Sequence, residues 1–128
     1  MEAEWPGRAE RENETMMSDP TTIDYVAANE AKHRLVLIIQ EDRPWDDYPT
    51  MHDQLRMKVD TYIGYVMDPS FQREYPGVMP EDVDMMLFCF HPPGPKSLIF
   101  FDTVRQVLAQ YKMTFSHAVN PMNRPAYG

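Results

Sequence analysis

A run of five apolar residues, Leu35-Val36-Leu37-Ile38-Ile39, leads almost directly into an acidic turn and constrains the fold more than any other part of the chain. An uninterrupted apolar run is typical of a strand covered on both faces, as in a parallel or mixed sheet. The turn, residues 41–47, holds four carboxylates, one tryptophan and a proline that cannot extend a strand. The sequence therefore predicts a buried strand that ends in an exposed polar loop.

Negative charge is concentrated around this turn. Residues 20–128 contain 14 acidic and 10 basic side chains, and residues 41–53 alone contain five acidic side chains and one basic side chain. The rest of this region is therefore electrically balanced. The whole chain has a net charge of −8, whereas general nucleic-acid binding needs clustered Lys and Arg. We expect no nucleic-acid partner.

The hydrophobic pattern predicts alternating strands and helices. β-Branched and apolar runs predict strands at residues 22–27, 34–40, 83–90 and 113–119. Apolar residues at three- and four-residue spacing predict one helix from Thr50 to the Asp68-Pro69 pair, with Lys58 on an outward face, and another that begins near Ser97. The order is β-β-α-β-α-β, and helical crossovers join parallel strands. The predicted fold class is α+β, a two-layer sandwich with a mixed four-stranded sheet and two helices on one face.

The chain is expected to form a single domain with an extension at each end. Residues 1–20 are polar and lack periodicity, and we interpret them as a disordered or non-native arm, with Met16 or Met17 as the native start. Residues 21–119 form the predicted domain, and residues 120–128 a flexible tail. No run approaches the roughly 18 apolar residues of a membrane span, and no apolar signal segment is present, so we expect a cytoplasmic protein without a membrane partner. The single cysteine, Cys89, is expected to be reduced and buried.

A set of residues distributed along the chain carries a resemblance to a known family. These residues are Ile23-Asp24-Tyr25-Val26, Leu35–Ile39, Pro44-Trp45-Asp46, Leu55, Lys58, Tyr62, Tyr75-Pro76 and Pro92-Pro93. Together they resemble a family of small, uncharacterised bacterial proteins, a domain of unknown function, over residues 22–119. The resemblance implies the fold and a bacterial, cytoplasmic setting. It implies no activity, and it transfers no catalytic residue.

The predicted topology brings two loops to one edge of the sheet. Parallel strands at 34–40 and 83–90 end at the same edge, and ligands tend to bind beyond the carboxyl ends of such strands. The predicted partner-binding residues at this edge are Glu41, Asp42, Arg43, Trp45, Asp46, Asp47, His91 and Lys96. Trp45 has two interpretations, a lid over the core or an exposed anchor, because tryptophan is enriched at interface hot spots.

These features favour a small acidic, non-enzymatic protein-interaction module of the immunity, inhibitor or accessory type, whose partner presents a basic surface. The alternative is a metal-dependent, nuclease-like enzyme that uses Glu41, Asp42 and Asp46, because carboxylates bind Mg²⁺ and Ca²⁺. No motif assigns a catalytic residue, a metal ligand or a cofactor, and the four histidines lack paired ligand spacing. Helices would cover only one face of an apolar sheet, so a homodimer, another partner or the C-terminal tail is expected to cover the other face.

Overall fold

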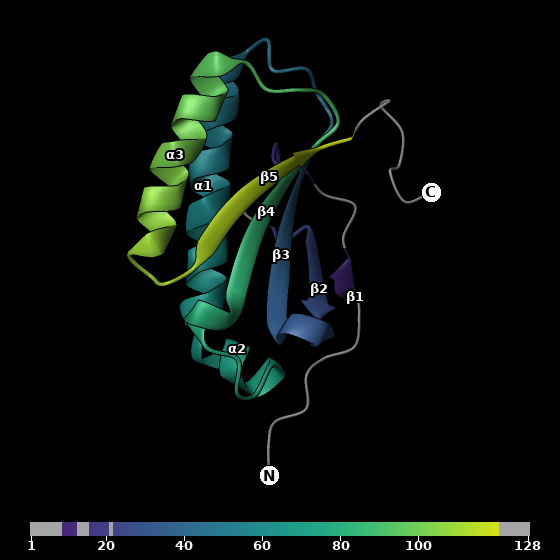
Figure 1. The fold of residues 1–128 in the computed structure, drawn as a ribbon, viewed down its shortest axis with the longest axis vertical. Coiled ribbons are helices and arrows are strands. Elements are labelled where there is room, and N and C mark those ends of the chain that lie inside the picture. Colours follow the sequence, from purple (N-terminus) through teal and green to yellow (C-terminus); the bar gives the residue numbers. More distant parts are fainter. Residues whose placement is uncertain (1–8, 13–15, 21, 121–128) are drawn as a thin grey trace.

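The computed structural model describes residues 9–12, 16–20 and 22–120 (Figure 1). The strands in this part of the chain are β1 (Ala9–Glu12), β2 (Tyr25–Asn29), β3 (Arg34–Glu41), β4 (Val83–Cys89) and β5 (Thr114–Val119). The α-helices are α1 (Tyr48–Met67), α2 (Pro69–Glu74) and α3 (Pro95–Ala109), and the short 3₁₀ helices Glu30–Lys32 and Pro80–Asp82 precede β3 and β4. The predicted order β-β-α-β-α-β is confirmed from β2 onward, with α2 as one additional short helix.

The strands form one mixed sheet in the order β1-β2-β3-β4-β5. β2 pairs antiparallel with β1 and β3, whereas β3–β4 and β4–β5 are parallel. Helices α1 and α3 lie side by side on one face of this sheet (Figure 1). The predicted two-layer α+β sandwich is therefore confirmed, and both crossovers place the carboxyl ends of β3 and β4 at the same edge.

The N-terminal segment differs from its prediction in one respect. Ala9–Glu12 pairs with β2 and adds an edge strand that the sequence did not predict, because one alanine followed by three charged residues carries no alternating apolar pattern. Met17 is also fully buried, and its backbone N–H donates to Gln40 O at 2.7 Å. The predictions for residues 1–8, 13–15, 21 and 121–128 lie outside the described residues.

The core lies between the sheet and its two helices. Alternate residues of β3 and β4 are buried, so their helix-facing side chains, including Leu37 and Met85, are fully inaccessible. They pack against the apolar stripes of α1 and α3, which include Leu55 and Phe101. Side chains on the opposite face, such as Ile38, remain half-buried. The continuous apolar run in β3 therefore supplies one fully buried face and one partly covered face.

Lys58 corrects the prediction that it faces outward. Its side chain is fully buried, and Nζ lies 2.6 Å from Asp24 Oδ1. Nζ also donates to Asp19 O at 2.6 Å and to Thr22 Oγ1 at 3.2 Å. The residue faces the chain segment that leads into β2, and a buried ammonium is tolerated there because a carboxylate and two oxygen acceptors surround it. Helical periodicity predicts which side of α1 carries the apolar residues. It does not predict which chain segment packs over Lys58.

Tyr62 extends this buried polar network into the sheet. Its hydroxyl donates to Ile38 O at 2.8 Å and accepts from Asp24 N at 2.8 Å. Burial, and secondarily the Asp24 carboxylate, raise the pKa of Tyr62 well above its ordinary value, so the hydroxyl remains protonated and can donate. Gln40 N donates to Asp24 Oδ2 at 3.0 Å. The network thus joins α1, β3 and the start of β2 at the carboxyl edge of the sheet.

Candidate functional site

The loops that follow β3 and β4 meet at the carboxyl edge of the sheet. Glu41 and Cys89 are register partners, and Phe90 N donates to Glu41 O at 2.9 Å immediately beyond them. A pocket of about 330 Å³ lies between the two loops and the helices that follow them. It is lined by Trp45, Tyr48, Gly94, Pro95, Lys96 and Ser97. The structure therefore brings the two loops together as the topology predicted.

Trp45 is a lid over the core, which is the first of its two sequence interpretations. Only 8% of its surface is exposed, and its ring meets Phe101 edge-on at a centroid distance of 5.6 Å. The interpretation of Trp45 as a protruding anchor is wrong, because the indole is held between α1, α3 and the sheet. Its Nε1 is buried and, among the described residues, forms no hydrogen bond of standard geometry, but it lies close enough to the Cys89 thiol to lower the pKa of that thiol. Trp45 also lines the pocket.

Glu41 is held internally and is unavailable to a partner. Its side chain is fully buried and accepts from Arg43 Nε at 2.8 Å, from Arg43 NH2 at 2.7 Å and from Arg43 N at 2.7 Å. The same guanidinium donates to Gln54 Oε1 on α1 at 2.7 Å. Hydrogen bonding to Glu41 raises the pKa of Arg43 above its ordinary value. These contacts anchor the loop to α1; Glu41 is buried by them, whereas the Arg43 side chain remains 38% exposed.

Three carboxylates of the same loop remain accessible. Asp42, Asp46 and Asp47 are exposed and form no ion pair with any residue that the structure describes. Asp42 and Asp47 lie near enough to Arg43 to raise the pKa of its guanidinium further. Asp46 and Asp47 stand in the chain between Trp45 and Tyr48, two residues of the pocket wall. The accessible acidity therefore borders the pocket.

Helix α1 begins at Tyr48, two residues before the predicted Thr50, and this brings a second aromatic ring into the site. Pro49 is tolerated in the first turn of α1, because the backbone N–H groups of a first turn have no acceptor within the helix. Lys96 from the other loop donates to Tyr48 OH at 3.0 Å, and its Nζ lies 5.2 Å from the ring centroid. The hydrogen bond to Tyr48 raises the pKa of Lys96. An ammonium group thus rests on an aromatic face at the mouth of the pocket.

His52 and Ser97 form a polar contact behind the pocket. His52 Nε2 lies 2.7 Å from Ser97 Oγ, and the imidazole stacks on Phe100 at 4.5 Å with an interplanar angle of 3°. Desolvation lowers the pKa of His52, although Asp53 acts in the opposite direction. Ser97 is 2% exposed, and His52 has no hydrogen bond to a carboxylate within the described residues. We assign the pair to packing between α1 and α3, because an activated serine also needs an orienting group on its base.

The remaining predicted residues divide by position. Lys96 lines the pocket, whereas His91 is half-buried in the same loop and does not line it. Sequence reasoning missed Tyr48, His52 and Ser97 as members of the site. Helical spacing could have identified Tyr48 and His52 as neighbours, since they are four residues apart on α1. The second helix was predicted to begin near Ser97, but α3 begins at Pro95 with Gly94 as its N-cap.

A metal centre is not supported at this edge. Glu41, the central residue of the metal alternative, is already occupied by Arg43. In the part of the chain that the structure describes, no group of three His, Cys, Asp or Glu side chains could hold a metal ion. No described helix combines the length and apolarity that a membrane crossing requires.

Comparison with known protein families gives one match. Residues 15–121 match the model of the family of unknown function DUF6572. The chain belongs to this family. The match spans β2 to β5 and therefore all of the site described above. No curated protein and no solved structure matches the chain significantly.

Proposed function

We propose that this member of DUF6572 is a non-enzymatic binding module that recognises a basic segment of another protein at the carboxyl edge of its sheet. One observation carries the proposal. The pocket between the two loops already holds an ammonium group, that of Lys96, against the Tyr48 ring, while three accessible carboxylates beside it lack ion partners among the described residues. The site is thus chemically suited to lysine or arginine side chains.

The chemistry of recognition follows from these groups. A lysine or arginine of the partner displaces Lys96 and takes the Tyr48 face, where cation–π attraction operates. Asp46 and Asp47 form charge-assisted contacts with neighbouring basic residues and accelerate the encounter. The internal Glu41–Arg43 pair keeps the loop in place, so little conformational freedom is lost on binding. Trp45 closes the pocket toward the core and prevents the partner from reaching it.

The cellular setting is part of the proposal. Cys89 is a free, fully buried thiol, which suits a reducing compartment, and we place the module in the bacterial cytoplasm. An acidic module that covers a basic surface fits inhibitor, immunity or accessory roles. The metal-dependent enzyme is the alternative function, and it would require Asp42 and Asp46 to act without Glu41.

A labelled arginine- and lysine-containing peptide tests the charge requirement. Fluorescence anisotropy should show that the substitution Asp46→Lys weakens peptide binding on the order of tenfold, because a favourable charge contact becomes repulsive. The matched control is Glu81→Lys, which makes the same charge change at the opposite end of β4. Tyr48→Leu should weaken binding by removing the aromatic face. Equal effects of Asp46→Lys and Glu81→Lys would show that only net charge matters and would reject the site.

A second experiment separates the proposal from the enzyme alternative. Thermal unfolding is measured with and without Mg²⁺ or Ca²⁺ in excess. The binding module predicts no specific rise in Tm, whereas a ligand bound only by the folded state at one hundred times its Kd adds about 2.7 kcal/mol of stability. A marked rise that Asp42→Asn or Asp46→Asn abolishes would favour a metal site and contradict the proposal.

A further inference from the structure

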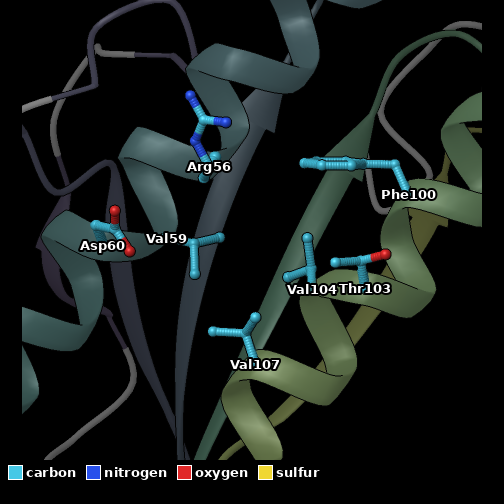
Figure 2. A pocket seen from close by; sticks show the side chains of 7 residues that line it. All are labelled: Arg56, Val59, Asp60, Phe100, Thr103, Val104 and Val107. Atoms are coloured by element: carbon cyan, nitrogen blue, oxygen red, sulfur yellow. The ribbon is translucent and has the colours of Figure 1, made fainter.

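A second surface lies on the opposite side of the helix layer from the sheet. A groove of about 200 Å³ runs between α1 and α3 (Figure 2). Its lining residues are Arg56, Val59, Asp60, Phe100, Thr103, Val104 and Val107. Figure 2 shows the α1 and α3 side chains facing one another across this groove, with the Phe100 ring directed toward α1. The floor is apolar, and the charged groups stand on the α1 side only.

Exposed apolar side chains also occur elsewhere on the two helices. Val107 is 37% exposed within the groove, and Met57 on α1 and Ile99 on α3 are 46% and 68% exposed. Exposed apolar groups on both helices of one layer are the composition expected of an interface. α1 has 20 residues and is about 30 Å long, so two adjacent helices present on the order of 600 Å². That area approaches the roughly 800 Å² that each partner buries in a standard interface.

The charges on α1 identify the occupant. Asp60 has no ion pair within the described residues, and Arg56 is paired only with Asp53 of its own helix, at 3.2 Å, through side chains 63% and 65% exposed. Arg56 and Asp60 are four residues apart on α1. Consider a two-fold axis that is perpendicular to the helices and passes between Arg56 and Asp60. This axis reverses the order of the two residues in a second copy. Arg56 of each copy then meets Asp60 of the other.

The α3 side of the groove is compatible with the same symmetry. Phe100 lies toward the Arg56 end of the groove and Val107 toward the opposite end (Figure 2). The reversal that pairs Arg56 with Asp60 also brings Phe100 of one copy toward Val107 of the other, while Val104 stays near the axis. Closed two-fold dimers with such self-complementary surfaces are the commonest soluble oligomers. A partner of a single charge sign would leave either Arg56 or Asp60 facing a like charge.

We propose that the α1–α3 groove is the interface of a homodimer, formed by a second copy of this chain related by a two-fold axis through residues 56–60 of α1. This surface is distinct from the carboxyl-edge pocket, so each can be tested without the other. The area and the exposed charges suit a reversible dimer, whose population depends on protein concentration and on salt.

Sedimentation equilibrium of the full chain over a wide range of concentration tests this dimer. Arg56→Asp and Asp60→Arg should each raise the dimer Kd on the order of tenfold, because each creates two like-charge contacts by symmetry. The double variant Arg56→Asp/Asp60→Arg should restore association, since it only exchanges the partners. Arg105→Asp serves as the control on α3, because Arg105 lies outside the groove.

An apolar variant gives an independent result. Val107→Asp should abolish association, with circular dichroism confirming that the exposed position tolerates the change. Asp46→Lys should leave the dimer unaffected. A monomer at every concentration, a double variant that fails to restore association, or association that Val107→Asp leaves intact would each overturn the proposal. The last result would place the contact on another surface.

Discussion

Replacing Lys58 with methionine tests whether the buried ion pair holds the carboxyl edge together. The side chains of Lys58 and Asp24 are both fully buried, and Nζ contacts three oxygens within 3.2 Å. Methionine fills a similar volume but leaves the Asp24 carboxylate without this ammonium. Breaking a buried pair by removing one partner costs about 3–5 kcal/mol, a large share of the roughly 5–15 kcal/mol that stabilises a domain. We expect Tm to fall by about 10–15 °C.

Urea unfolding followed by far-UV circular dichroism measures this cost. Asp24→Asn in the Lys58→Met background should recover much of the loss, because a neutral amide needs no counterion and can still accept from Gln40 N. Arg56→Ala is the control, since its exposed pair with Asp53 should contribute less than about 1 kcal/mol. A loss below about 1 kcal/mol for Lys58→Met, or no recovery in the double variant, would refute a charge-neutralising role for Lys58.

Three further predictions concern the buried groups around the pocket. Trp45→Ala should cost about 3–5 kcal/mol in urea unfolding, whereas Trp45→Phe should cost less than about 1.5 kcal/mol, because a phenyl ring keeps most of the packing and the lost Nε1 forms no hydrogen bond of standard geometry among the described residues. Equal costs would contradict the packing role. Burial, followed by the nearby Glu41 carboxylate, raises the pKa of Cys89 to about 12. Alkylation of Cys89 in the native protein at pH 8 should therefore be far slower than alkylation in urea. Stability should also fall as pH rises from about 9 toward 12, because the thiol ionises first in the unfolded state. Rapid alkylation of the native protein would contradict this prediction. Burial lowers the pKa values of His52 and His117, so the unfolded state binds protons first on acidification. Stability should therefore fall as pH decreases through the ordinary histidine pKa near 6.5. Proton NMR titration should give both histidines pKa values below 6.5.

Residues with strong periodicity were predictable from the sequence. The apolar run of β3 and the spacing of Leu55, Val59 and Tyr62 on α1 determine the strand and the buried side of the helix. The rule that helical crossovers join parallel strands then gives the shared edge of β3 and β4. These predictions succeeded because they depend on local pattern and on a topological rule that holds for nearly all such units.

The predictions that failed concern buried ion pairs, one between distant segments and one between residues only two positions apart. Lys58 is buried against Asp19, Thr22 and Asp24, and no local pattern places these residues over α1. Glu41 was predicted to be accessible, but Arg43 lies two residues away and folds back onto it. A charge count treats both residues as surface groups. Which acids remain accessible can be known only after each internal cation has been assigned to its partner.

The two internal ion pairs explain why the accessible acids stay together. Lys58–Asp24 fixes the entry to β2 against α1, and Glu41–Arg43 fixes the exit of β3 against Gln54 on the same helix. Each cation forms its close ion pair with a fully buried carboxylate, and Arg43 acts on the exposed Asp42 and Asp47 only at longer range. The exposed negative charge at the carboxyl edge is thus a consequence of the pairing of Lys58 and Arg43 with buried carboxylates. The position of this exposed negative charge depends on α1, the helix that anchors both ion pairs.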